Sequence, residues 1–157
     1  MGNKILILGA SGFIGNKLYK ELLPYFDVYG TFKSPNKEFE ENTVMFHFDM
    51  NKNTIQTILT EVQPNFIIST TKGNYKSQLS LHQELLNYVL AAIDCKLLYL
   101  SSFSVFNAKG KFPSYEEDPL SSNTIAGKYK IKQEKAIKKL PSSKYVILRL
   151  PKMLRKN

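Results

Sequence analysis

Three glycines, each three residues from the next, follow a short apolar run near the start of the chain. Residues 4–8 are rich in Ile and Leu, and Gly9, Gly12 and Gly15 come next within GASGFIG. Glycines so placed allow a tight turn off a strand, a close approach of backbone N–H groups to a phosphate, and tight packing of the following helix. The helix N-terminus attracts the anion. The pattern predicts a cradle for the pyrophosphate of a dinucleotide, with a purely structural turn as the alternative.

Two polar positions after later strands bear on which dinucleotide binds. Lys33 and Ser34 follow the second predicted strand, where NAD-binding proteins carry an acid. No acid occurs between Lys33 and Glu38. A cation and a hydroxyl favour the 2′-phosphate of NADP over the ribose diol of NAD, although Lys33 could equally be an ordinary exposed lysine. Asp49 follows the third strand and could meet the adenine amino group. Its alternative role is to cap a helix that begins near Asn51.

These motifs give a set of predicted cofactor-binding residues. The loop 71–75 is expected where the sugar phosphates of the cofactor would pass. The predicted residues are Gly9, Ser11, Gly12, Phe13, Ile14, Gly15, Lys33, Asp49, Met50, Ser69 and Thr70.

Strands and helices must alternate along the chain to position these residues. Alternating or apolar runs of β-formers predict strands at 4–8, 27–32, 43–48, 65–70, 96–100 and 144–150. Helical patterns fall at 16–23, 53–62, 77–94 and 124–140, and the third has an apolar stripe of Leu81, Leu85, Leu86, Val89, Leu90 and Ile93. Such alternation with right-handed crossovers predicts a doubly wound α/β domain, with a parallel sheet in the order 3-2-1-4-5-6. Residues 1–157 are predicted to form one domain with a short basic tail, 151–157.

Composition narrows the class of protein. The 157 residues carry a net charge of +9, and eleven of the 22 Lys and Arg lie in 128–157 beside the single acid Glu134. Nucleic-acid binding is one interpretation, but no aromatic side chains interleave with these lysines to stack bases, so a solvated helix face and tail are favoured.

Location and metal chemistry follow from what the sequence lacks. No apolar run approaches the roughly 18 residues of a membrane span, and the first strand leaves no room for a signal peptide. Cys95 is the single cysteine, which argues against disulfides and cysteine metal clusters. We therefore expect a cytoplasmic protein with no metal site and no membrane partner.

Further motifs resemble a known family. Residues 99–107 read YLSSFSVFN, residues 112–119 read FPSYEEDP, and Gly127, Lys130 and Glu134 share a helical spacing. With GASGFIG, these resemble the extended short-chain dehydrogenase/reductase superfamily, the NAD-dependent epimerases and dehydratases. The branch most similar is dTDP-4-dehydrorhamnose reductase. The resemblance implies a Rossmann NAD(P)-binding fold and oxidoreductase or epimerase chemistry on a nucleotide-sugar in carbohydrate biosynthesis.

The resemblance also implies roles for particular residues and exposes a departure. Ser102 falls on the catalytic Ser/Thr, and Lys130 falls on the Lys that holds the nicotinamide ribose and lowers the pKa of a catalytic Tyr. Ala126 occupies the position of that Tyr. Loss of a general acid costs about 10²- to 10⁴-fold in rate. Tyr129, one helical turn along, is a candidate replacement, whereas His47 and His82 are expected to be packing or surface residues.

Length is the second departure from the family. Its members continue into a C-terminal domain that binds the sugar, and the present sequence stops soon after the sixth strand. Two functions remain open. One is a nucleotide-sugar reductase or epimerase impaired by Ala126 and the missing substrate domain, and the other is a non-catalytic NADP-binding module that regulates or scaffolds a protein partner or forms a homodimer.

Overall fold

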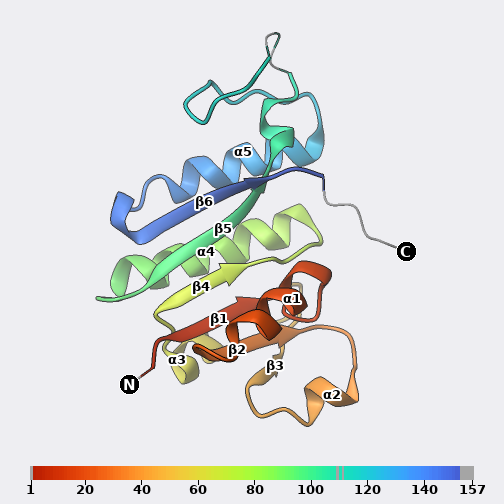
Figure 1. The fold of residues 1–157 in the computed structure, drawn as a ribbon, viewed down its shortest axis with the longest axis vertical. Coiled ribbons are helices and arrows are strands. Elements are labelled where there is room, and N and C mark those ends of the chain that lie inside the picture. The colour runs from red at the N-terminus through yellow and green to blue at the C-terminus, as the bar shows by residue number, and fades with distance from the viewer. Residues whose placement is uncertain (1, 109, 111, 153–157) are drawn as a thin grey trace.

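The sheet is fully parallel, as the alternation of strands and helices predicted. The computed structural model describes residues 2–108, 110 and 112–152, so the end of the predicted tail, 153–157, lies outside the described residues. Six strands are in the order β3-β2-β1-β4-β5-β6 (Figure 1). They are β1 (Lys4–Leu8), β2 (Asp27–Phe32), β3 (Met45–His47), β4 (Phe66–Ser69), β5 (Lys96–Ser102) and β6 (Tyr145–Leu150).

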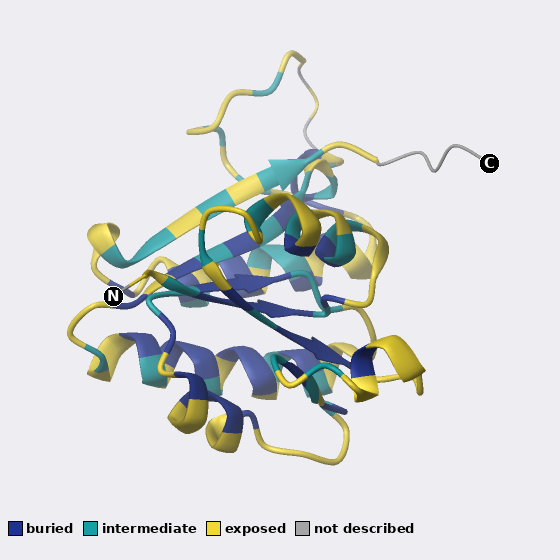
Figure 2. Cartoon of the chain, turned by 60° about the horizontal axis from the view of Figure 1, so that its bottom comes forward, coloured by how far each residue is buried: buried dark blue, intermediate teal, exposed yellow. Residues whose placement is uncertain are grey.

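Helices cover both faces of this sheet. They are α1 (Phe13–Leu22), α2 (Lys37–Glu40), α3 (Gln56–Val62), α4 (Tyr75–Ala91) and α5 (Ile125–Ile137), with single 3₁₀ turns η1 (Phe103–Phe106) and η2 (Ser142–Lys144). Tyr19 of α1 and Phe39 of α2 pack with β1, β2 and β3 in one apolar cluster. The helices α3, α4 and α5 contribute to a second cluster with β1, β4 and β5. Figure 2 shows the buried residues concentrated in the central strands between these layers.

Most predicted elements are confirmed, and the differences have local causes. The third helix begins at Gln56 rather than near residue 51, because the residues after Asp49 form a hydrogen-bonded turn first. The polar stretch 34–42 contains the one-turn helix α2, which the Asn36 side chain caps by accepting from the Glu38 N–H. These short elements depend on single polar contacts rather than on hydrophobic periodicity.

The apolar stripe predicted on the third helical pattern was wrong at its C-terminal end. Leu81, Leu85, Leu86 and Val89 are buried, but Leu90 is 60% exposed and Ile93 is 101% exposed. The helix ends at Ala91, so Ile93 lies beyond the helical repeat. Leu90, one residue after the buried Val89, lies on the side of the helix that faces away from the core.

Parallel pairing brings the carboxyl ends of the strands to one edge of the sheet. Leu8 at the end of β1 pairs with Ser69 of β4, and Ser102 of β5 pairs with Leu150 of β6. The order reverses between β1 and β4, which opens the crevice in which doubly wound sheets bind their ligands. The predicted site residues therefore gather at this edge.

Candidate cofactor cleft

The glycine turn after β1 has the backbone geometry that a close-packed phosphate cradle needs. Gly9 adopts φ +81°, and its carbonyl accepts from the Gly12 N–H at 3.0 Å. A Cβ on Gly15 would lie 2.1 Å from the Gly9 carbonyl oxygen, so only glycine lets α1 start this close to β1. The first bond of α1 runs from the Asn16 N–H to the Gly12 carbonyl at 2.8 Å, with no side-chain cap at Gly12. The positive end of α1 therefore faces the turn.

Two threonines hold this turn from the neighbouring strands. Thr31 Oγ1 of β2 accepts from the Gly9 N–H at 2.9 Å. Thr70 Oγ1, just after β4, donates to the Leu8 carbonyl at 2.8 Å and lies 3.2 Å from the Gly9 carbonyl. The sequence prediction included Thr70 but missed Thr31, and the one signal that could have found it was a hydroxyl side chain near the end of the second predicted strand.

A cleft of about 230 Å³ opens over the turn, and most of the predicted cofactor residues line it. Thr31, Phe32, Phe48, Asn51 and Thr71 to Gly73 complete the lining. The predicted residues that line this cleft are Gly9, Ser11, Gly12, Phe13, Ile14, Gly15, Lys33, Met50 and Thr70.

Asp49, also predicted to bind the cofactor, is not among the described residues that line this cleft. Its Oδ1 accepts from the Asn51 N–H at 2.9 Å and lies 3.6 Å from Lys33 Nζ. The backbone hydrogen bond from Asn51, with the Lys33 charge, lowers the pKa of the Asp49 carboxyl. The helix-capping alternative was wrong, because α3 begins at Gln56 and Asp49 closes a turn instead. Asp49 therefore forms an ion pair with Lys33, which lines the cleft.

A second cleft of about 330 Å³ shares Ile14, Thr70, Thr71 and Lys72 with the first and continues toward β5 and β6. It is lined by Ser69, Ser102 and Lys130, which were the remaining predicted site residues. The charged residues among the described lining of both clefts are lysines: Lys33, Lys72, Lys130 and Lys152. The joined clefts suit a long anionic ligand.

Lys130 is fixed at the inner end of this second cleft. Its Nζ donates to the Leu100 carbonyl at 3.0 Å and lies 4.8 Å from the centre of the Tyr99 ring. Burial lowers the pKa of Lys130, and Lys72 lowers it further while Glu134 opposes the shift. Ser102 Oγ accepts from the Ser104 N–H at 3.2 Å and so caps η1. Both side chains are partly exposed to the cleft.

Tyr129 does not take the place that Ala126 leaves. Ala126 is exposed in the first turn of α5. Tyr129 is 6% exposed, and its hydroxyl donates to Gln78 Oε1 at 3.3 Å and accepts from Gln133 Nε2 at 2.7 Å. Burial raises the pKa of Tyr129 to about 12. It is absent from the described lining of both clefts, so its hydroxyl serves the contact between α4 and α5.

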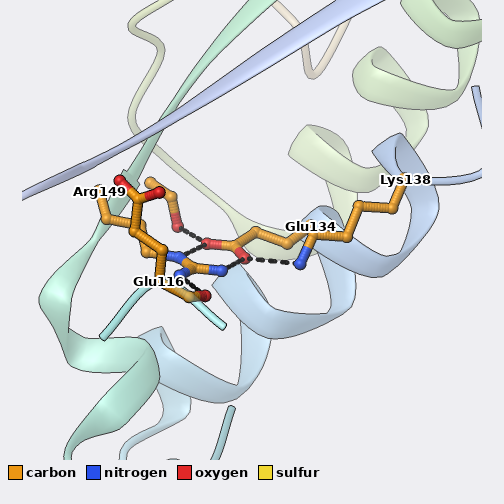
Figure 3. A network of polar contacts seen from close by, with 5 residues as sticks. Glu116, Glu134, Lys138 and Arg149 are labelled. Carbon is orange, nitrogen blue, oxygen red and sulfur yellow. Dashed lines mark hydrogen bonds and ion pairs between the residues drawn. The ribbon is translucent and has the colours of Figure 1, made fainter. Parts of the chain in front are cut away.

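A buried ion pair holds α5, and with it Lys130, against the sheet. Glu134 has no exposed surface, and its carboxylate accepts from Arg149 of β6 and from Ser101 Oγ of β5 at 2.6 Å. Arg149 Nη1 also donates to the Glu116 carbonyl at 2.8 Å. Figure 3 shows the Glu134 carboxylate between the Arg149 guanidinium and the Lys138 ammonium. The sequence placed Glu134 in a helical motif but gave no sign that Arg149 was its partner.

The remaining features add no further chemistry to the site. The described residues hold no group of three or more His, Cys, Asp and Glu side chains that could share a metal ion. Among those residues, every helix falls short of the length and hydrophobicity that a bilayer crossing needs.

A family model matches nearly the whole chain. The model described as the NAD dependent epimerase/dehydratase family matches residues 5–154. Methionine adenosyltransferase 2 subunit beta of Bos taurus is 27% identical over 148 residues, covering 85% of this chain and 42% of that protein.

Solved structures share the fold. The dTDP-4-dehydrorhamnose reductase of Bacillus anthracis str. Ames, in complex with NADP, is 25% identical with a TM-score of 0.66, covering 96% of this chain and 54% of that one. WbmG of Bordetella bronchiseptica, in complex with NAD and UDP, is 15% identical with a TM-score of 0.75, covering 95% and 53%. The chain thus spans about half the length of these structures.

Proposed function

Because the chain belongs to the NAD dependent epimerase/dehydratase family, we propose that it binds NADP as the cofactor part of a nucleotide-sugar reductase or epimerase whose proton chemistry is impaired. The contact between Gly15 and Gly9 carries this proposal, since a Cβ at Gly15 would stand 2.1 Å from the Gly9 carbonyl oxygen. A helix that starts this close to the strand presents its free N–H groups to an anion at the N-terminus of α1. The relative that shares 25% identity was solved with NADP.

The cleft residues would divide the cofactor between them. The turn 9–15 and the start of α1 would hold the pyrophosphate, and Lys33 would meet the 2′-phosphate. Lys130 would hold the nicotinamide ribose at the second cleft, where it already donates to the Leu100 carbonyl, and Ser102 would be the catalytic hydroxyl in the same cleft. Bound NADPH would supply a hydride. Ala126 has no proton to donate, so we expect little turnover from this chain.

Calorimetric titration with NADPH and NADH tests the cofactor part of the proposal. We expect micromolar binding of NADPH and weaker binding of NADH. In Gly12→Ala the new Cβ has one close neighbour, the Gly9 carbonyl oxygen at 3.3 Å, and otherwise projects into the space for the phosphate. That variant should fold and lose at least about tenfold in NADPH affinity. If the wild-type chain binds neither nucleotide, the proposal is wrong.

A non-catalytic module that regulates or scaffolds a protein partner is the second candidate. It is favoured by Ala126 and by the burial of the Tyr129 hydroxyl away from the cleft. A relative at 27% identity is named as a subunit of a methionine adenosyltransferase. Ala126→Tyr separates the candidates in an NADPH-oxidation assay with a 4-keto nucleotide-sugar. Restored turnover of about 10²- to 10⁴-fold favours the impaired enzyme, and NADPH binding without any gain favours the module.

A further inference from the structure

A buried polar network lies beneath the second cleft, and it includes His82, for which the sequence suggested only a packing or surface role. It joins the end of β4 to α4 and α5. Its members are almost fully buried, with exposed fractions of 3% for Ser69, 5% for Gln78, 1% for His82, 6% for Tyr129 and 1% for Gln133. Polar groups buried at this cost are normally hydrogen-bonded, and the direction of each bond can be worked out from its partner.

The Gln78 carbonyl fixes which nitrogen of His82 carries the proton. His82 Nδ1 lies 2.7 Å from the Gln78 carbonyl oxygen, which can only accept, so Nδ1 is the donor. Burial, together with the Lys130 charge and against the opposing hydrogen bond to the Gln78 carbonyl, lowers the pKa of His82 to about 4, so the ring is neutral. The Tyr99 ring packs edge-on at 5.3 Å. A neutral ring with Nδ1 protonated has a bare lone pair on Nε2.

That lone pair determines the direction of the Ser69 hydroxyl. Ser69 Oγ lies 3.0 Å from His82 Nε2, and a hydroxyl has one hydrogen, so Ser69 donates it to His82. Ser69 also lines the second cleft, beside Thr71, whose Oγ1 is 3.5 Å from Ser69 Oγ. Toward the cleft, Ser69 can therefore only accept a hydrogen bond. This series of hydrogen bonds, from Ser69 through His82, ends at the Gln78 backbone carbonyl. It therefore orients the groups and does not conduct protons.

We infer that His82 is a positioning residue: it fixes Ser69 as an obligate hydrogen-bond acceptor in the second cleft, and this point selects a ligand group that carries an N–H or O–H. The identity of that group rests on the proposed function: it is an amide N–H or a ribose hydroxyl of the nicotinamide half of the cofactor. A bare acceptor, such as a carbonyl or a phosphate oxygen, would meet only lone pairs on Ser69 Oγ.

The ring of His82 can be tested without any ligand. The chain has two histidines, so the variant His47→Gln leaves His82 as the sole source of imidazole signals. Nitrogen-15 NMR of this cofactor-free variant at neutral pH should show a protonated Nδ1 and an unprotonated Nε2. A ring protonated at Nε2, or a cationic ring, overturns the inference whether or not the protein binds NADPH.

A double-mutant cycle tests the action of His82 through Ser69. Ser69→Ala and His82→Leu should each weaken NADPH binding by about 3- to 10-fold, the range that one neutral hydrogen bond supplies. The double variant should bind no more weakly than either single one, because both remove the same oriented hydroxyl. His82→Gln, whose amide oxygen can accept from Ser69, should bind within about twofold of wild type.

The cycle distinguishes this inference from the proposed function. If the wild-type chain fails to bind NADPH, the proposed function fails, and the NMR measurement still decides the direction of the Ser69 hydroxyl. If the wild type binds but the losses in the two single variants add, His82 acts independently of Ser69 and the inference is wrong. Thermal unfolding of each variant shows whether the affinities are those of folded proteins. If His82→Leu does not fold, His82→Gln still tests the inference, because a clear loss of NADPH affinity in that variant would contradict it.

Discussion

Glu134 and Arg149 form a two-point ion pair inside the protein. Arg149 Nε donates to Oε1 at 3.1 Å and Nη2 donates to Oε2 at 2.8 Å, and Glu134 has no exposed surface. Burial on its own would raise the pKa of Glu134, but the hydrogen bonds from Arg149 and Ser101 outweigh it, and the pKa is lowered. The pair connects Glu134 of α5 to Arg149 of β6, fifteen residues later in the chain. It therefore fixes the helix that carries Lys130 and Ala126.

Breaking this pair should destabilise the fold strongly. Glu134→Gln leaves the partly buried Arg149 guanidinium without its buried partner charge, so the free energy of unfolding should fall by about 3–5 kcal/mol. Urea denaturation followed by circular dichroism measures the change. The exposed Glu61→Gln on α3 is the matched control and should change stability by less than about 0.5 kcal/mol. Equal losses in the two variants would contradict a structural role for the pair.

Stability should depend on pH through His82. The pKa of His82 falls from its ordinary value of 6.5 in the unfolded chain to about 4 in the folded protein. Between these values the unfolded state binds the extra proton, so stability is complete above pH 6.5 and falls by about 1.4 kcal/mol per pH unit toward pH 4.

Urea titrations from pH 4 to 7 should show this slope in wild type and in His47→Gln. The slope should be smaller by that amount in His82→Gln, which cannot take up the proton. Parallel curves for wild type and His82→Gln would mean that His82 is protonated in the folded protein or that its pKa is not shifted.

The second and third glycines of the motif, Gly12 and Gly15, should separate folding from binding. In Gly15→Ala the Cβ would press on the Gly9 carbonyl oxygen at 2.1 Å and on Thr70 Oγ1 at 2.8 Å, so α1 must move off β1. We expect a loss of about 1–3 kcal/mol in stability, with loss of NADPH binding. Gly12→Ala should keep its melting temperature and lose only binding. A normal melting temperature for Gly15→Ala would show that the close approach is not needed.

Lys33 should set the choice between the two nucleotides. Lys33→Ala removes from the cleft lining a cation whose Nζ lies 3.6 Å from Asp49 Oδ1. NADPH affinity should fall by about tenfold, the scale of one charge-assisted hydrogen bond, while NADH affinity stays within about twofold. Lys17→Ala, on the exposed side of α1, is the control for net charge and should change neither. If both affinities fall together in Lys33→Ala, Lys33 does not discriminate by the 2′-phosphate.

Local pattern in the sequence was enough for the strands, the sheet order and the glycine turn. β1 and β2 have the predicted bounds because apolar and β-branched runs are periodic over neighbouring residues. The turn was predictable because its glycines are required by backbone constraints that act within seven consecutive residues. Parallel order then followed from the crossover rule and needed no knowledge of individual contacts.

Only the tertiary structure decided the polar partners, since each depends on residues distant along the chain. Ser101 meets Glu134 from 33 residues away, and Tyr129 meets Gln78 from 51. The sequence around a single Tyr, His or Asp does not show whether that side chain faces solvent, a cleft or a buried partner. The folded chain buries Tyr129 against α4, pairs Asp49 with Lys33, and turns His82 toward Ser69. Hydrogen bonds are short-ranged and directional, so these roles are fixed only when packing brings donor and acceptor together.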